Sequence, residues 1–233
     1  MDVVVTWPRE ELAARLRERS KRDLIESMLV RSPNPGATEK LVIALEAYPL
    51  VYLLLASEHP TKIWILDRDE KVSSADILTP EMRGRRWHSA NLSIDDCEGL
   101  TDAAPGLVAM VASWRSVLVM RHEFAHVVTT FFSPDQRAAL GQLFLRSQAA
   151  DHFSEPLARE SIGEFVACAI SYLFFDDLRA DLSQFDPVLY RFVSRLLSRA
   201  EDLSQTILLT DAAHAEGETL AGRPAAPEWS RSC

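Results

Sequence analysis

The feature that most constrains this chain is a run of five residues, His122-Glu123-Phe124-Ala125-His126. Four residues advance an α-helix by about 6 Å and just over one turn, so the two imidazoles lie on one face and can share a metal ion. Glu123 lies beside them. This is the H-E-x-x-H arrangement, in which two histidines hold Zn²⁺ and the glutamate acts as general base toward a metal-activated water.

The residues around the motif favour a buried helix. Val119 and Met120 precede it, Val127 and Val128 follow it, and only Arg121 brings a charge into the flanks. Burying two imidazoles and a carboxylate is costly unless they have partners. A metal ion removes that cost. The alternative is a helix whose histidines only form hydrogen bonds inside the core.

A catalytic zinc ion needs a further protein ligand and an open position for water. An apolar helix predicted over residues 160–169 offers two glutamates, Glu160 and Glu164, and Glu164 follows His126 by 38 residues. Because the two glutamates are four residues apart, they share a helix face, and spacing alone does not choose between them. Either choice completes a His-His-Glu set.

The motif, together with Glu164-Phe165-Val166-Ala167, resembles the gluzincin metallopeptidases. Among them the chain is most similar to the small lethal-factor-type catalytic domains of bacterial toxins, over residues 38–178. The resemblance implies a zincin-like fold, one Zn²⁺ per chain and Glu164 as third ligand. Two departures are visible. Cys168 stands where these families often place an acidic residue that supports a histidine ligand, and the short run before Glu164 lacks the tyrosine that lethal-factor-type domains carry for the oxyanion.

Other residues are candidates for the oxyanion or for contacts behind the ligands. His152, Arg159 and Tyr172 each compete for the role of oxyanion donor, as some gluzincins use a histidine. An ordinary loop histidine is the simpler interpretation of His152. Glu160 is expected to lie behind the metal ligands if Glu164 is the ligand.

Composition limits the class of protein. The formal net charge is −9 and the pI is about 5.2, which disfavours nucleic acid as a partner because phosphate binding relies on a Lys/Arg surface. Three scattered cysteines without a C-x-x-C predict free thiols in a reducing compartment. No signal peptide is readable and no apolar run is long enough for a bilayer. We therefore expect a cytoplasmic protein, or one exported without a readable signal; the oligomeric state stays open.

Hydrophobic periodicity predicts a mostly helical α+β domain over residues 1–211, with a small mixed or antiparallel sheet packed on the motif helix. An N-terminal helix lies within residues 1–35, the catalytic core spans 38–178 and a C-terminal helix spans 187–205. Residues 61–66 are expected to form one strand and residues 87–94 a second strand. Residues 95–106 are expected to form an acidic loop. The motif helix is expected to begin within residues 107–113 and to end at about residue 132. Residues 212–233 are expected to be a disordered tail.

These features predict a zinc-dependent endopeptidase that hydrolyses peptide bonds of a protein substrate, with a toxin- or effector-like role. Two other functions stay open. One is an intracellular regulatory metalloprotease with a single partner. The other is a zinc-site module that binds proteins without cleaving them. Glu123 favours cleavage, because a binding module has no need of a general base.

Overall fold

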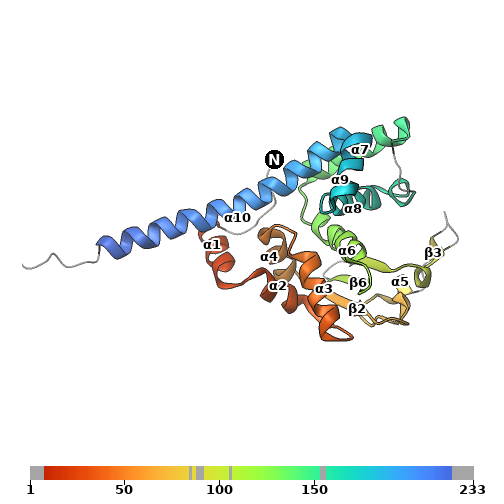
Figure 1. Ribbon diagram of the computed structural model, residues 1–233, viewed down its shortest axis with the longest axis horizontal. Helices are drawn as coiled ribbons and strands as arrows, with labels where there is room; N and C mark the ends of the chain where they lie inside the picture. The colour runs from red at the N-terminus through yellow and green to blue at the C-terminus, as the bar shows by residue number, and fades with distance from the viewer. Residues whose placement is uncertain (1–7, 84–85, 88–91, 105–106, 153–155, 222–233) are drawn as a thin grey trace, which may run out of the picture.

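The computed structural model describes residues 8–83, 86–87, 92–104, 107–152 and 156–221 of the 233-residue chain. Its elements form an α+β, zincin-like fold that is mostly helical and contains a four-stranded mixed sheet. Figure 1 shows the N-terminal helices and the sheet in one part of the molecule and the later helices in another, with the motif helix between them. The predicted fold class is therefore confirmed.

The N-terminal segment folds as two helices, and the single helix predicted for this segment is wrong. α1 spans Arg9–Glu18 and α2 spans Lys21–Met28. Ser20 separates them because its hydroxyl accepts a hydrogen bond from the Asp23 backbone N–H, while the Asp23 carboxylate accepts one from the Ser20 backbone N–H. This capping box starts a new helix at Lys21.

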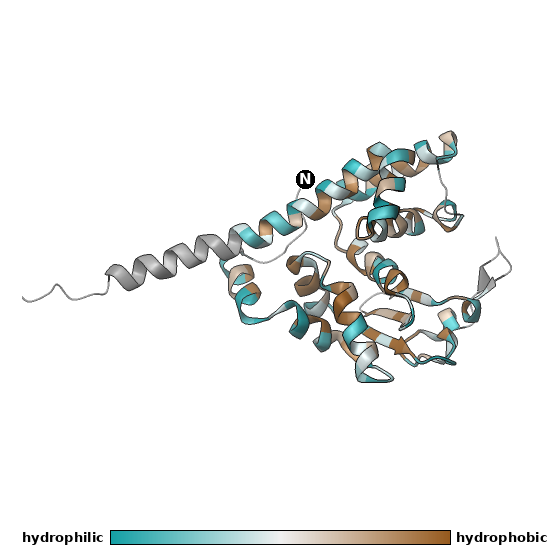
Figure 2. Ribbon diagram, viewed as in Figure 1, coloured by the Kyte–Doolittle hydropathy of each residue, from teal (hydrophilic) through white to brown (hydrophobic). Residues whose placement is uncertain are grey.

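The next two helices supply much of the core. α3 spans Pro35–Leu45, with the Asn34 side chain as its N-cap, and α4 spans Leu50–Glu58. Residues 51–56 of α4 are all buried, as expected for a helix that is hydrophobic on every side. The hydropathy colouring shows the same concentration of apolar residues in α4 and in the neighbouring strands (Figure 2).

The sheet has the strand order β1-β2-β6-β5. Its strands are β1 Leu29–Arg31, β2 Thr61–Leu66, β5 Gly99–Ala104 and β6 Leu107–Ser113. β1, β2 and β6 run parallel, and β5 pairs antiparallel with β6 at the edge. The strand predicted over residues 61–66 is confirmed, and the sheet is mixed.

Two predictions near the motif are wrong. Residues 107–113, expected to begin the motif helix, form β6, and the helix α6 spans Val117–Thr129. Residues 99–104, expected to belong to an acidic loop, form β5. β6 is buried on both faces, so its apolar residues run without alternation, and periodicity does not distinguish such a strand from the start of a buried helix.

The two faces of the sheet are covered differently. Val108, Met110 and Ala112 of β6 pack with the helices, whereas Ala109 and Val111 pack in a smaller cluster on the other face. That smaller cluster lies under short elements: η1 Val72–Ser74, α5 Pro80–Arg83, and η2 Ile94–Asp96. The predicted strand over 87–94 is instead a short pair, β3 Arg86–Trp87 and β4 Leu92–Ser93, and residues 88–91 lie outside the described residues.

The C-terminal part is helical: α7 Pro134–Ala150, η3 Leu157–Arg159, α8 Ile162–Tyr172, α9 Asp176–Phe185 and α10 Pro187–Ala221. α10 is longer than the predicted 187–205 and continues into the segment expected to be disordered; residues 222–233 are not among the described ones. It passes the other helices and extends beyond them (Figure 1). Over the described part of the chain, no helix combines the length and apolar character that crossing a bilayer requires.

Candidate metal centre

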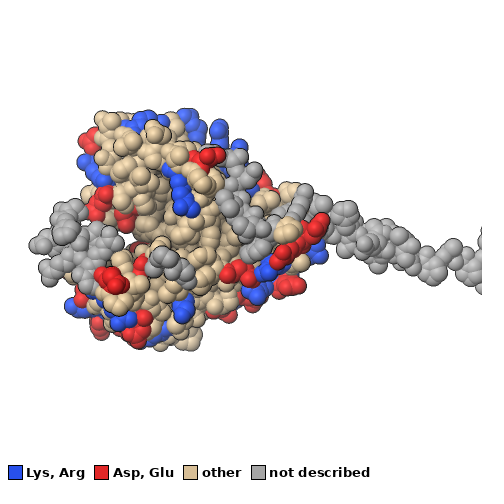
Figure 3. Space-filling model, turned by 180° about the vertical axis from the view of Figure 1, so that it is seen from behind, with Lys and Arg blue, Asp and Glu red and all other residues tan. Residues whose placement is uncertain are grey.

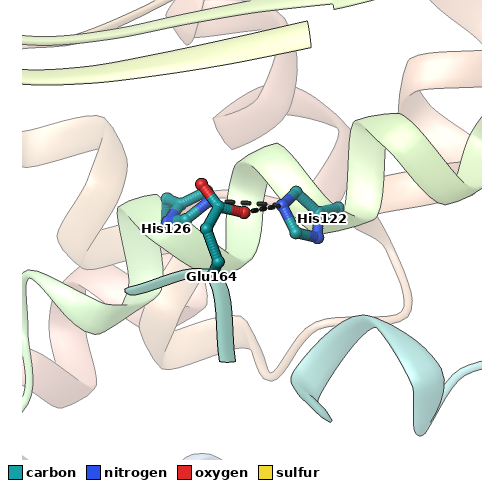
Figure 4. A group of neighbouring side chains, drawn as sticks. All are labelled: His122, His126 and Glu164. Carbon is teal, nitrogen blue, oxygen red and sulfur yellow. Dashed lines mark hydrogen bonds and ion pairs between the residues drawn. The ribbon is translucent and has the colours of Figure 1, made fainter. Parts of the chain in front are cut away.

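The helix α6 carries the motif between the sheet and the C-terminal helices. Ser116 caps its first turn by accepting a hydrogen bond from the Val119 backbone N–H. The helix packs on β5, β6, α3 and α8. His122 and His126 lie one turn apart on the face that meets α8, and Figure 4 shows Glu164 reaching toward both rings from α8.

The three side chains converge on one point. Nε2 of His122 lies 3.2 Å from Nε2 of His126 and 3.0 Å from Oε2 of Glu164, and Nε2 of His126 lies 3.5 Å from Oε1 of Glu164. Ligand atoms of a tetrahedral zinc site, each about 2.0–2.1 Å from the metal, are separated by roughly 3.3 Å. The residues present therefore fit a zinc ion, and their nitrogen and oxygen donors are of the type that zinc accepts.

Glu164 is placed by the start of α8. Ser161 caps this helix by accepting a hydrogen bond from the Glu164 backbone N–H. Burial alone would raise the pKa of Glu164, but its hydrogen bonds with His122 and His126 lower that pKa to about 2. Burial is the largest single influence on His126 and acts to lower its pKa, but the hydrogen bond with Glu164 and the negative charges of Glu123 and Glu164 together raise that pKa. Glu164 is thus an ionised carboxylate over the whole neutral range, as a metal ligand needs to be.

Glu123 occupies a different environment from Glu164. Its side chain is 6% exposed, and its Oε2 accepts a hydrogen bond of 2.8 Å from the hydroxyl of Thr101 on β5. Burial raises the pKa of Glu123, although the two neighbouring imidazoles and Thr101 act in the opposite direction. The two glutamates of the site therefore differ as a ligand and a proton acceptor would: the pKa of Glu164 falls and that of Glu123 rises.

A cavity of about 300 Å³ adjoins these side chains. Apolar and aromatic residues make up much of its lining: Leu118, Val119, Leu157 and Tyr172. In the space-filling view the molecule is hollowed between its helical part and its sheet part, and the visible interior of the hollow is mostly uncharged (Figure 3). The candidate ligands therefore meet a space large enough for part of a peptide.

The other candidate residues lie in different places. Glu160 and Tyr172 line the same cavity as the three converging side chains. His152 is exposed and lines a smaller cavity of about 40 Å³ between α8 and α9. Arg159 pairs with Asp151 at 2.8 Å and is not among the residues that line the larger cavity. The structure thus brings Glu160 and Tyr172 to the candidate centre and leaves His152 and Arg159 outside its lining.

Two β5 residues beside Glu123, Gly99 and Thr101, were not predicted from the sequence. Thr101 donates its hydroxyl to Glu123, and Gly99 comes so close to the same side chain that a Cβ there would lie 2.7 Å from the Glu123 Cγ. Both residues fall in the segment interpreted as an acidic loop. The usable signal was Gly99 itself, since a glycine inside a strand often marks a close approach by another part of the chain.

Comparison with known proteins agrees with this fold. No protein-family model and no curated protein sequence matches the chain. Among solved structures, the chain is similar to the Pro-Pro endopeptidase PPEP-2 from Paenibacillus alvei, with a TM-score of 0.54 and 19% sequence identity. The match covers 74% of this chain and 99% of that one. At this identity the similarity establishes a shared fold.

Proposed function

We propose that this chain is a zinc-dependent endopeptidase of the gluzincin type, which hydrolyses peptide bonds of a protein substrate. The observation that carries the proposal is the convergence of His122, His126 and Glu164, whose ligand atoms are 3.0–3.5 Å apart, with the buried carboxylate of Glu123 beside them. The similarity of the fold to a Pro-Pro endopeptidase supports the same reaction class.

Each residue has a distinct role in the proposed reaction. His122, His126 and Glu164 would hold the zinc ion, which when bound would activate a water molecule and polarise the scissile carbonyl. Glu123 would take a proton from the attacking water and deliver it to the leaving amine. Its raised pKa suits this exchange, because a carboxylate of very low pKa accepts protons poorly.

The cavity beside the site supports a peptide as substrate. It joins an apolar lining to the edge strand β5, so a side chain of the substrate can occupy the cavity while its backbone lies near the zinc ligands. A toxin- or effector-like protease and a regulatory protease of one partner would share this chemistry. They differ in the protein that is cleaved.

The proposal is tested by comparing new protein N-termini in a proteome treated with the wild-type chain or with Glu123→Gln. This change preserves the size of the side chain and removes the proton acceptor, so cleavage should fall by about 10² to 10⁴ while zinc content is unchanged. Glu81→Gln, an exposed change on α5, is the matched control and should cleave as the wild type does. Equal cleavage by Glu123→Gln would refute the mechanism. No new N-termini with the wild type, despite bound zinc, would favour the binding module.

A further inference from the structure

We propose that the edge strand β5 positions the Glu123 carboxylate, with Gly99 providing the space for it and Thr101 fixing its orientation. Both are positioning residues, because they act through Glu123. This inference rests on the proposed function, since the orientation of Glu123 matters to catalysis only if the chain is a hydrolase. Neither residue belongs to the two metal-binding motifs.

Gly99 and Thr101 face Glu123 because they are two residues apart on a strand. Side chains alternate between the faces of a sheet, so residues 99 and 101 share one face and residues 100 and 102 share the other. Leu100 packs in the small cluster on the face away from α6. Asp102 accepts a hydrogen bond of 2.9 Å from the Thr79 hydroxyl, near α5. Gly99 and Thr101 are thereby directed toward α6.

The hydroxyl of Thr101 lies within hydrogen-bond distance of two oxygens of Glu123. Its Oγ1 lies 2.8 Å from Oε2 of the Glu123 carboxylate and 2.9 Å from the Glu123 backbone carbonyl. A hydroxyl has one proton, so it donates to one of these oxygens at a time, and the ionised carboxylate is the stronger acceptor. The bond restrains one carboxylate oxygen and leaves the other to exchange a proton.

Gly99 sets the distance between strand and helix. A Cβ at this position would lie 2.7 Å from Cγ of Glu123, 2.7 Å from Cγ1 of Val119 and 2.8 Å from Oε1 of Glu123. Real Cβ atoms do not approach other heavy atoms so closely, so an alanine here would displace the Glu123 side chain or push β5 away from α6. The role of Gly99 is steric, because its backbone is not in the left-handed region that favours glycine.

β5 is held too firmly to absorb such a change by sliding. It is paired along its length with β6, from Gly99 opposite Ala112 to Ala104 opposite Leu107. Just before the strand, the Glu98 carbonyl accepts a hydrogen bond of 2.7 Å from the Ser113 backbone N–H. Asp102 adds the contact with Thr79 on the other face. The side chains of Glu123 and Val119 are therefore the parts that must move when a side chain is added at residue 99.

The first test replaces Thr101. The assay substrate is a synthetic fluorogenic peptide, chosen from a defined library that includes Pro-Pro bonds as the one that the wild type cleaves fastest. Thr101→Val keeps the shape and removes the donor, so kcat should fall by about 10-fold or more with KM and zinc content unchanged. Thr101→Ser restores the hydroxyl and should recover most of kcat. Thr61→Val is the matched control: the Thr61 hydroxyl is buried without a hydrogen-bond partner among the described residues.

The second test replaces Gly99. Gly99→Ala should lower kcat by at least as much as Thr101→Val, with zinc retained. Gly141→Ala is the control, because a Cβ there meets only Ile162 Cδ1 at 3.9 Å, an ordinary contact inside α7. Wild-type kcat in Gly99→Ala or Thr101→Val would overturn the proposal. Loss of zinc in Thr101→Val, or no recovery with Thr101→Ser, would also overturn it.

A third measurement does not depend on activity. Melting temperatures are compared for the wild type, Thr101→Val, Glu123→Ala and the double variant. If Thr101 holds the carboxylate, Thr101→Val lowers the melting temperature by a few degrees when Glu123 is present and by much less when it is absent. Equal losses in both backgrounds would refute the contact. If the wild type cleaves no peptide, only the proposed function is refuted. The comparison of the four melting temperatures still tests the contact between Thr101 and Glu123.

Discussion

The Sγ of Cys168 lies 3.8 Å from Nδ1 of His122, on the side of the imidazole opposite to the nitrogen that faces Glu164. Cys168 is 6% exposed and stands one helical turn after Glu164 on α8. A histidine that binds zinc through Nε2 usually donates its Nδ1–H to a carboxylate or carbonyl that orients the ring. Here a sulfur atom, a weak acceptor, occupies that place.

We predict that Cys168→Ala weakens zinc binding by about 10-fold, at the lower end of what losing a partner behind a ligand usually costs. The variant should fold and keep zinc when the metal is in excess, because the bond that is lost is weak. Competition with a chelator of known affinity measures the effect. Cys97→Ala is the control, because it removes the thiol of another residue of the cavity lining, one that donates to the Ser93 carbonyl at 3.9 Å. Unchanged zinc affinity in Cys168→Ala would show that the thiol only fills space.

A second prediction separates Glu164 from Glu160 as the third ligand. Purified protein should carry about one zinc per chain, and His122→Ala, His126→Ala and Glu164→Gln should each lose it. Glu160→Gln should retain it, since Glu160 lies at the end of η3 and does not belong to the converging cluster. Metal analysis of the four variants decides this. Zinc lost from Glu160→Gln and kept in Glu164→Gln would reverse the assignment.

The part of this site that could be predicted from the sequence is the part that local periodicity governs. His122 and His126 share a face because they are one turn apart on a helix, and that needs no tertiary information. Spacing did not choose between Glu160 and Glu164, and only the resemblance of Glu164-Phe165-Val166-Ala167 to the gluzincin motif favoured Glu164. The structure brings these three side chains together through the packing of α6 on α8.

The strands beside the site could not be predicted in the same way. The apolar run of β6 is continuous because both of its faces are buried, and such a run resembles the buried helix that follows it. The contacts of Gly99 and Thr101 with Glu123 depend on pairing between β5 and β6 and on packing against α6. By contrast, the sequence does carry a signal for the break between α1 and α2, which the single-helix prediction missed: Ser20 and Asp23 have the spacing of a capping box.

A third prediction concerns the reactivity of Cys97. Burial raises the pKa of this thiol to about 11 from an ordinary value of 9.0, and the negative charge of Glu123 adds to the effect. The raised pKa means that the folded chain favours the neutral thiol, so this contribution to stability is present below pH 9.0 and is lost as the pH rises through about 11. The native protein therefore has little reactive thiolate at neutral pH.

Alkylation by iodoacetamide at pH 8 should consequently be about 100-fold slower at Cys97 in the native protein than in the protein unfolded in guanidinium chloride, because raising the pKa from 9.0 to about 11 lowers the thiolate fraction by that factor. Peptide mass spectrometry after timed quenching gives the rate at this residue separately from the other cysteines. A native rate close to the unfolded one would contradict the raised pKa.

The last prediction concerns Arg121, which joins the helix of the motif to the ends of two others. Its Nε donates to the Ala44 carbonyl in the last turn of α3 at 3.1 Å, and its guanidinium donates to the Phe174 carbonyl, just after α8, at 3.0 Å. The guanidinium also lies over the rings of Phe174 and Phe175. The Arg121 carbonyl in turn accepts a hydrogen bond from the buried Tyr48 hydroxyl. Carbonyls at helix ends lack hydrogen-bond donors within their own helix, and Arg121 donates hydrogen bonds to two such carbonyls.

We predict that Arg121→Met lowers the free energy of unfolding of the metal-free protein by about 1–3 kcal/mol, because the side chain keeps its apolar stem while two carbonyls lose their donor. Arg121→Lys should recover only part of the loss. A lysine ammonium is not planar, so it cannot reproduce the hydrogen bonds of the guanidinium together with its stacking on the phenylalanine rings. Arg195→Met is the control, at an exposed position on α10 without a hydrogen bond or ion pair among the described residues. Because Arg121 fixes α6 relative to α8, Arg121→Met should also weaken zinc binding. Equal stability of Arg121→Met and Arg195→Met in chelator would contradict this role.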